Sequence, residues 1–292
     1  MRLLVFAALL ACALGARAAV NARDDTGHLV RVPAPAKRVV SLAPNLTELV
    51  FAAGAGDRVV GVISGSDYPP AARRLPRVGI EGAIDPEAVL ALRPDLVVAW
   101  PSAGDARVLE RLAALGIPVF RSEPRSLDDI AHTLETLGRL TGRSAPAEAA
   151  ARDFRERLAR LEREYSGRAK VGVFYEVWDR PLMTVGARDL ITQVIRLCGG
   201  ENVFAHLPGL APQIDREAVL RADPEAIVAS GTNGKRPAWL DDWRAFPSLL
   251  AVQRDNLFFV PPDLLQRDTP RILEGADRLC ADLDAARARR PR

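Results

Sequence analysis

The sequence predicts an α/β protein of two lobes with mainly parallel sheets, joined by one long, rigid α-helix, with a ligand cleft between the lobes. Three observations lead to this fold class. Expected strands and helices alternate, a 17-residue block recurs 130 residues later, and a charged, one-faced helical segment lies mid-chain. Such alternation is typical of parallel sheets covered on both faces. We expect a leader over 1–18, an N-terminal lobe over 19–143, a connecting helix over 144–167 and a C-terminal lobe over 168–292.

The segment 144–167 has the pattern of a long helix with one apolar face. Its apolar residues follow one another at steps of four, three, four, three and four, the spacing of one helix face. They are Ala147, Ala151, Phe154, Leu158, Leu161 and Tyr165. Arg and acidic residues four apart fill the other face, and Ser144 and Gly167 suit the two ends. The segment therefore predicts a rigid spine between two lobes; the alternative is an ordinary surface helix of one domain.

In the first half, short apolar segments typical of buried strands alternate with helical segments. The expected strands are 39–42, 58–63, 96–100 and 118–120. The expected helices are 47–53, 85–92, 108–115 and 127–141. Gly54 and Gly116 follow two of these helices, where glycine commonly ends a helix.

The second half repeats this plan. Its expected strands are 170–175, 226–229 and 257–260, and its expected helices are 190–198, 216–222 and 269–286. Residues 84–100 (IDPEAVLALRPDLVVAW) and 214–230 (IDREAVLRADPEAIVAS) are identical at nine of seventeen positions. Such a repeat indicates two copies of one lobe. Ligands bind at the carboxyl ends of parallel strands, so we expect the cleft where these ends face each other.

The composition is that of a folded protein without a nucleic-acid partner. The 292 residues suffice for two domains of about 120–140 residues. The chain is 48% hydrophobic and 26% charged, and 37 acidic residues nearly balance 40 basic ones. This balance leaves no basic excess for binding nucleic acid.

Residues 1–18 have the pattern of a cleavable signal peptide. Arg2 precedes an apolar run over 3–14 that is too short to span a bilayer, and an Ala-Arg-Ala sequence at 16–18 suits cleavage. We expect an exported, soluble protein that begins near Ala19. Cys12 leaves lipid anchoring as the less favoured alternative.

Cys198 and Cys280 are the two cysteines of the expected exported chain. An even number of cysteines in an oxidising compartment predicts a disulfide, here within the C-terminal lobe. Two buried free thiols are the alternative.

The sequence shows no set of residues for catalysis or metal binding. His28, His132 and His206 have no zinc-binding spacing, and 231–235 (GTNGK) lacks the spacing of a phosphate loop. We therefore expect neither an enzyme nor a metal site; an exported enzyme of the same fold is the alternative.

Five segments carry a resemblance to a known family. They are 38–49 (RVVSLAPNLTEL), 67–70 (DYPP), 92–97 (LRPDLV), 198–204 (CGGENVF) and 269–272 (TPRI). They resemble the helical-backbone (class III) periplasmic substrate-binding proteins of ABC importers, and among these the cobalamin (vitamin B12) binders. The resemblance implies a periplasmic monomer with two Rossmann-like lobes and little hinge motion. It also implies delivery of a corrinoid, as transported ligand and not cofactor, to a permease dimer with its ATPase.

The resemblance implies ligand contacts at Asn45, Gly65, Trp100 and 263–267, with Asp263 and Arg267 as the polar residues. Trp100 ends the expected strand 96–100, where its ring could press on a macrocycle; the alternative is a core tryptophan. Asp263 and Arg267 fall on an expected loop and could hydrogen-bond to corrin amides; the alternative is a surface ion pair. Trp178 follows the first expected strand of the second lobe, and we add it by this position. Tyr68 is a weaker candidate, because the alternative for 67–70 (DYPP) is a rigid turn.

The chain also departs from the cobalamin binders. Gly65, Glu81 and Ala211 stand where those proteins carry aromatic residues. Fewer rings weaken stacking and Glu81 adds a charge, so a ferric siderophore or another iron chelate is the alternative ligand. Haem is less favoured because no Tyr or His is poised as an axial ligand.

Glu87 and Glu217 occupy equivalent positions in the 17-residue repeat, at the starts of two expected helices. The resemblance implies that both dock onto arginines of the permease. The alternative is a local structural role, because a carboxylate near the N-terminus of a helix stabilises that helix.

Overall fold

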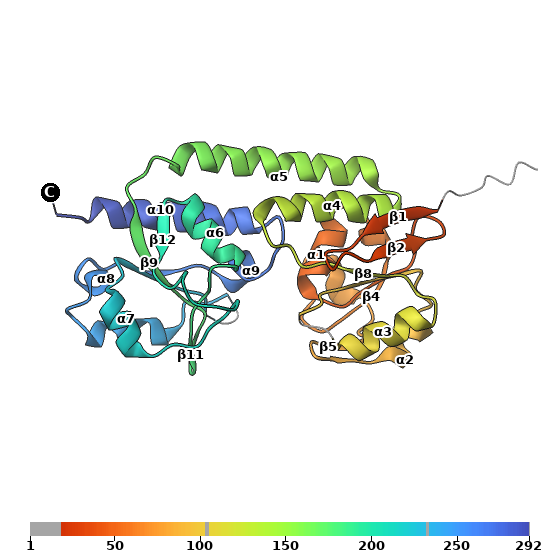
Figure 1. Ribbon diagram of the computed structural model, residues 1–292, viewed down its shortest axis with the longest axis horizontal. Coiled ribbons are helices and arrows are strands. Elements are labelled where there is room, and N and C mark those ends of the chain that lie inside the picture. Colours follow the sequence, from red (N-terminus) through yellow and green to blue (C-terminus); the bar gives the residue numbers. More distant parts are fainter. Residues whose placement is uncertain (1–18, 103–104, 232–233, 292) are drawn as a thin grey trace, which may run out of the picture.

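The computed structural model describes residues 19–102, 105–231 and 234–291. The expected leader over 1–18, with Cys12, lies outside these residues. Two α/β lobes lie side by side, and one long helix, α5 (Ser144–Tyr165), runs across the top of both (Figure 1). The predicted fold class is therefore confirmed: two parallel-sheet lobes joined by one long helix.

The N-terminal lobe contains a parallel sheet in the order β4-β3-β7-β8. The strands are β3 (Val39–Ser41), β4 (Val59–Val62), β7 (Leu96–Ala99) and β8 (Val119–Arg121). The helices are α1 (Pro44–Ala52), α2 (Pro86–Ala91), α3 (Ala106–Ala114) and α4 (Leu127–Thr141). Val39 belongs to the hydrophobic cluster of α1 and α4, and Val40 to that of α2 and α3, because successive strand residues point to opposite faces. Helices thus cover both faces of the sheet.

The C-terminal lobe contains the matching parallel sheet, in the order β12-β9-β13-β14. The strands are β9 (Val171–Glu176), β12 (Gly200–Asn202), β13 (Ala226–Ala229) and β14 (Leu257–Phe259). The helices are α6 (Leu190–Leu197), α7 (Arg216–Ala222), α8 (Leu250–Gln253), α9 (Pro262–Leu265) and α10 (Ile272–Ala288).

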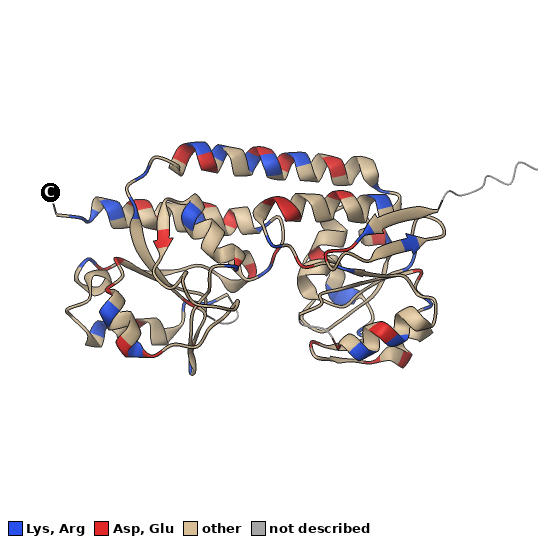
Figure 2. Ribbon diagram, viewed as in Figure 1, with Lys and Arg blue, Asp and Glu red and all other residues tan. Residues whose placement is uncertain are grey.

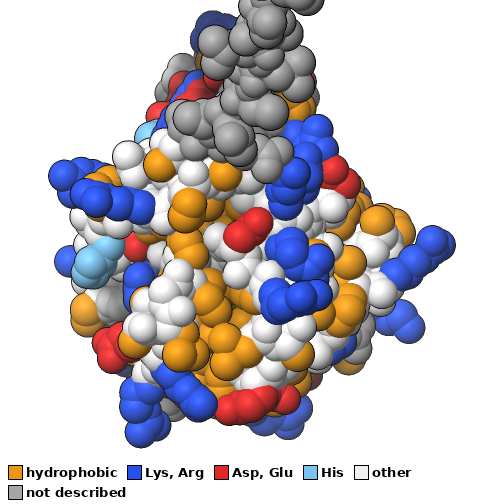
Figure 3. Space-filling view, turned by 90° about the vertical axis from the view of Figure 1, so that its right-hand side faces the viewer, with side chains coloured by type: hydrophobic (Ala, Val, Ile, Leu, Met, Phe, Trp, Pro, Cys, Tyr) orange, Lys and Arg blue, Asp and Glu red, His pale blue; other side chains and the backbone are white. Residues whose placement is uncertain are grey.

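Smaller elements complete the two lobes. Three antiparallel pairs join β1 (Val20–Arg23) to β2 (Leu29–Val32), β5 (Gly79–Ile80) to β6 (Ala83–Ile84), and β10 (Trp178–Asp179) to β11 (Leu182–Met183). The 3-10 helices are η1 (Gly56–Arg58), η2 (Pro70–Arg74) and η3 (Ala238–Ala245). Figure 3 shows the N-terminal lobe from the side turned away from the other lobe, where apolar side chains are exposed among basic ones.

The sequence repeat is also a structural repeat. α2 and α7 both begin after an aspartate, and Asp85 and Asp215 accept hydrogen bonds from the backbone N–H groups of Ala88 (2.9 Å) and Ala218 (2.7 Å). After each helix the chain turns at a residue with positive φ, Arg93 (45°) or Asp223 (41°). The strands that follow, β7 and β13, hold equivalent places in the two sheets. The two lobes are therefore copies of one plan.

The connecting helix α5 packs on α4, α6 and α10 through the expected apolar face. Its buried residues are Ala147, Ala151, Phe154, Leu161 and Tyr165. Leu158, expected on the same face, is only partly buried. One detail of the prediction was wrong: Ser144 is the first helical residue and provides no cap. The helix ends at Tyr165, and Gly167 follows its C-cap residue, Ser166.

The charged face of α5 also differs from the expectation. Figure 2 shows acidic and basic residues along the whole helix. Their ion pairs run to neighbouring helices: Arg155 pairs with Asp128 and Glu135 of α4, and Arg157 pairs with Asp277 of α10. The charges therefore fasten the spine to helices of both lobes.

Cys198 and Cys280 form a disulfide, as predicted, between the C-terminal end of α6 and the middle of α10. Both cysteines are fully buried. The bond links two helices that cover one face of the C-terminal sheet.

Three segments near the cleft differ from the expectations. The strand β7 ends at Ala99, so Trp100 follows the strand and does not end it. The expected loop over 263–267 contains a short helix, α9, whose first turn carries Asp263. The strand β12 was not predicted, because the sequence at 199–202 suggested only the end of a helix.

Candidate functional site: the inter-lobe cleft

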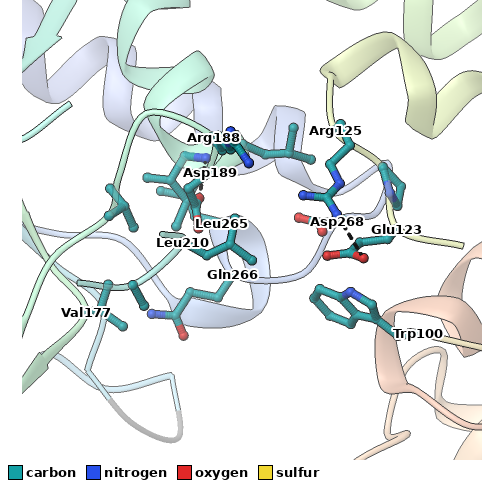
Figure 4. A pocket seen from close by; sticks show the side chains of 15 residues that line it. Trp100, Glu123, Arg125, Val177, Arg188, Asp189, Leu210, Leu265, Gln266 and Asp268 are labelled. Carbon is teal, nitrogen blue, oxygen red and sulfur yellow. Dashed lines mark hydrogen bonds and ion pairs between the residues drawn. The ribbon is translucent and has the colours of Figure 1, made fainter. Parts of the chain in front are cut away.

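The candidate site lies between the lobes, where the carboxyl ends of both sheets face each other (Figure 4). In the N-terminal lobe, Asn45 follows β3, Gly65 follows β4, Trp100 follows β7 and Glu123 follows β8. Val177 directly follows β9 of the other lobe. Parallel sheets bind ligands at this edge because loops there can vary without disturbing the core.

Two adjoining hollows form the site, and we refer to them together as the inter-lobe cleft. The first has a volume of about 200 Å³ and the second of about 370 Å³, and both are lined by Trp100 and Gln266. Trp100 therefore lies at their junction. Besides Trp100 and Gln266, the first hollow is lined by Glu123, Pro124, Arg125, Val177, Val185, Arg188, Asp189, Leu190, Ile191, Leu210, Ala211, Leu265 and Asp268. The second is lined by Pro44, Asn45, Ser64, Gly65, Glu81, Pro262, Asp263 and Arg267.

Carboxyl groups dominate the polar lining of the first hollow. Burial raises the pKa of Asp189 to about 6. Burial, with the negative charges of Asp189 and Glu123 nearby, raises the pKa of Asp268 to about 7. Near neutral pH, Asp268 is therefore partly protonated and can both donate and accept hydrogen bonds.

Two polar side chains of the cleft have buried atoms without a hydrogen-bond partner among the described residues. Asn45 is only 2% exposed, and neither its amide oxygen nor its amide nitrogen is paired. The indole N–H of Trp100 is likewise buried and unpaired. Unpaired buried polar groups are costly, so they favour the binding of a ligand that can pair with them.

An ion cluster fastens the lobes together beside the second hollow. Glu48, on α1 of the N-terminal lobe, is 3% exposed and accepts hydrogen bonds from Arg267 Nη1 (2.7 Å), Arg271 Nε (2.9 Å) and Arg271 Nη2 (2.7 Å) of the C-terminal lobe. We call these three residues the Glu48 clamp. Because it crosses from one lobe to the other, it ties the two lobes together beside the cleft.

Arg267 belongs to the clamp and to the cleft lining at once. It also pairs with Asp67 (2.8 Å) and Asp263 (3.1 Å). Burial would raise the pKa of Asp67, but the hydrogen bond and charge of Arg267 hold it below its usual range. The alternative considered for Asp263 and Arg267, an ion pair, is thus present in the structure, and it lies in the wall of the cleft.

The structure brings five of the seven expected ligand residues together. Asn45, Gly65, Trp100, Asp263 and Arg267 all line the second hollow. Glu81 lines it too, and Ala211 lines the first hollow, so the departures from the cobalamin binders fall within the cleft.

Tyr68 and Trp178 lie elsewhere. Tyr68 lines a separate hollow with Phe51 and Pro69, and its ring stacks against the guanidinium of Arg271 (3.9 Å). Trp178 is 43% exposed, and its indole N–H donates to the backbone oxygen of Arg180 (3.0 Å). Neither lines the inter-lobe cleft, because the loop paths after β4 and β9 carry them away from it.

Sequence reasoning missed the acidic residues of the first hollow. Glu123 lies two residues beyond the carboxyl end of β8, and the rule that ligands bind at strand ends, applied to every strand, would have identified it. Asp189 caps α6 and Asp268 follows α9, and only folding brings them near Glu123.

Glu87 and Glu217 are exposed in the first turns of α2 and α7. The two helices lie at the bottom of the two lobes, on the side of the molecule opposite α5 (Figure 1). Glu87 pairs weakly with Arg111 (3.2 Å), and both carboxylates are accessible to a partner.

The described residues show neither a membrane-spanning segment nor a metal centre. None of their helices is both long and apolar enough to cross a bilayer. They also contain no cluster of three or more His, Cys, Asp or Glu residues that could hold a metal ion.

Two parallel-sheet lobes, a helical link and a cleft of this kind define a bilobal ligand-binding protein. The chain belongs to the periplasmic binding protein family, whose model matches residues 39–264. The vitamin B12-binding protein of Vibrio cholerae is 37% identical over 265 residues, 89% of this chain and 94% of that protein. That of Yersinia pestis is 38% identical over 258 residues, 87% of this chain and 89% of the relative.

Solved structures show the same similarity. The periplasmic vitamin B12-binding protein of Vibrio cholerae matches with a TM-score of 0.80 at 36% identity, covering 87% of this chain and 98% of that one. A periplasmic haem-binding protein from Pseudomonas aeruginosa matches with a TM-score of 0.73 at 29% identity, covering 84% of this chain and 92% of that one. The fold is thus shared by binders of different macrocycles.

Proposed function

We propose that this chain is a periplasmic substrate-binding protein, not an enzyme, that delivers a cobalamin-like corrinoid to an ABC importer. The observation that carries the proposal is the inter-lobe cleft, with Trp100 at its centre and unpaired amide and indole groups around it. A flat aromatic ring provides apolar contact to a macrocycle, and the polar groups suit its amide side chains. The similarity to vitamin B12-binding proteins over most of the chain supports the same ligand.

An iron chelate is the second candidate, because a haem binder shares the fold. Haem iron is commonly held by His, Cys, Met or Tyr. None of these residue types is among the described residues that line the two hollows. The lining therefore favours a ligand whose metal already carries its own axial groups.

The proposal includes export by the leader over 1–18, a monomer in the periplasm, and docking on a permease dimer with its ATPase. Glu87 and Glu217 lie on equivalent helices of the two lobes, as two contacts to a two-fold symmetric permease require. Their charges would guide docking and its specificity more than its strength.

Calorimetric titration of the exported chain with cyanocobalamin, hemin and a ferric hydroxamate tests the proposed ligand. We expect cyanocobalamin to bind at one site per chain and the other two to bind far more weakly. Tight binding of hemin or of the hydroxamate, with none of cyanocobalamin, would replace the corrinoid by an iron chelate.

A further inference from the structure

We infer that the inter-lobe cleft selects a macrocycle whose rim carries neutral primary amides and discriminates against the same macrocycle bearing carboxylates. This inference rests on the proposed function and specifies its ligand class. It is carried by the charges that line the cleft and by the unpaired polar groups among them.

The cleft carries more acidic than basic side chains. Five acidic residues line the two hollows: Glu81, Glu123, Asp189, Asp263 and Asp268. Three arginines do so: Arg125, Arg188 and Arg267. The lining therefore disfavours a ligand that brings further negative charge.

The arginines are largely committed to carboxylates of the protein. Arg267 is shared among Glu48, Asp67 and Asp263. Arg125 pairs with Glu123 (3.2 Å), as Figure 4 shows. Arg188 is the exception, since it forms no ion pair within the described part of the chain; it is exposed to solvent, where an ion pair with a ligand carboxylate would be weak.

Asp268 is the acidic group best placed to sense the charge of a ligand. Its side chain has no hydrogen bond or ion pair with the described residues, and burial, together with the nearby charges of Asp189 and Glu123, raises its pKa. A primary amide on the ligand offers one acceptor and two donors, which a carboxyl group can match in either protonation state. A ligand carboxylate offers only acceptors and adds a like charge to a partly buried site.

Asn45 and Trp100 give independent support for an amide ligand. The side chain of Asn45 is 98% buried, lines the second hollow and lacks partners for both its donor and its acceptor. A primary amide pairs with another primary amide through one bond in each direction, whereas a carboxylate can serve only the donor. The indole N–H of Trp100 can donate to an amide carbonyl.

The test compares cyanocobalamin with its monocarboxylic acids, in each of which one peripheral amide is hydrolysed to a carboxylate. The full exported chain is titrated with each isomer separately at pH 8, above the pKa of Asp268, where its carboxylate is charged. We expect at least one acid to bind about tenfold or more weakly than cyanocobalamin, because like charges brought together in an interface are strongly unfavourable. In Asp268→Asn, that acid should bind within about threefold of cyanocobalamin, since the repelling charge is removed.

Asp242→Asn is the matched control, because it makes the same change of charge in the same lobe on an exposed residue outside the cleft. It should keep the wild-type discrimination, and a thermal melt checks that both variants fold. The inference is overturned if wild type binds all the acids as tightly as cyanocobalamin, or if Asp268→Asn discriminates like Asp242→Asn. Failure of cyanocobalamin itself to bind would overturn the proposed function as well, so the two failures are distinguishable.

Discussion

Glu48→Ala should destabilise the protein strongly, because it removes the central carboxylate of the Glu48 clamp. Glu48 is 3% exposed and receives three hydrogen bonds from two guanidinium groups. After its removal Arg267 keeps Asp67 and Asp263, but Arg271 loses the carboxylate it pairs with and keeps only the Tyr68 ring.

Removing one partner of a buried ion pair costs about 3–5 kcal/mol, because the other charge remains buried and uncompensated. We expect a loss near the lower end, about 3 kcal/mol, since Arg267 retains two other carboxylates. Equilibrium unfolding in urea, followed by circular dichroism, measures this change in the free energy of unfolding.

Glu135→Ala is the matched control, since Glu135 also pairs with an arginine but its side chain is 26% exposed. Exposed pairs contribute about 1 kcal/mol or less, so the control should lose far less stability. Equal losses in the two variants, or a loss below about 1 kcal/mol in Glu48→Ala, would refute the assignment of the clamp as a buried tie between the lobes.

Three further predictions concern the disulfide, a buried carboxyl group and docking. Replacement of both Cys198 and Cys280 by serine should lower the free energy of unfolding by about 4 kcal/mol, because the disulfide closes a long loop in the unfolded chain. An unchanged free energy of unfolding in urea would contradict this. Burial raises the pKa of Glu176 from 4.5 to about 8, so its contribution to stability is complete below pH 4.5 and is lost as the pH rises toward 8. Urea unfolding across this pH range should show a falling free energy of unfolding in wild type but not in Glu176→Gln. If the free energies of both proteins changed with pH in parallel, the shifted pKa of Glu176 would be contradicted. The double variant Glu87→Ala, Glu217→Ala should capture the permease poorly in a pull-down while binding ligand normally, and normal capture would leave only a local role for these glutamates.

Much of the fold could be predicted because local pattern and tertiary packing agree. The helix at 127–141 and the repeat strand at 226–229 have the predicted bounds. The apolar period that predicted α5 is the face that packs on α4. By contrast, β12 (Gly200–Asn202) contains residues with low strand propensity, and only pairing with β9 makes it a strand.

Part of the cleft could be predicted from the order of strands and loops along the chain. Residues a few positions beyond the carboxyl ends of strands, such as Asn45, Gly65 and Trp100, reach it because all parallel strands end at one edge. Tyr68 and Trp178 do not reach the cleft. Their positions depend on the conformations of loops, which the periodicity of the sequence does not predict. The approach of Asp189 to Asp268 likewise depends on how α6 and α9 pack, and their separation along the chain gives no sign of it.

Replacement of Trp100, compared with replacement of Trp178, tests the central claim that the inter-lobe cleft binds the corrinoid. Both Trp→Ala variants and wild type are titrated with cyanocobalamin by calorimetry, and a thermal melt of each sample checks folding. Trp100→Ala should weaken binding by about 1–3 kcal/mol through loss of a large apolar contact, with little change in melting temperature. Trp178→Ala, which changes an exposed ring outside the cleft, should bind as wild type does. Unchanged affinity in Trp100→Ala, or a loss confined to Trp178→Ala, would contradict the assignment of the binding site.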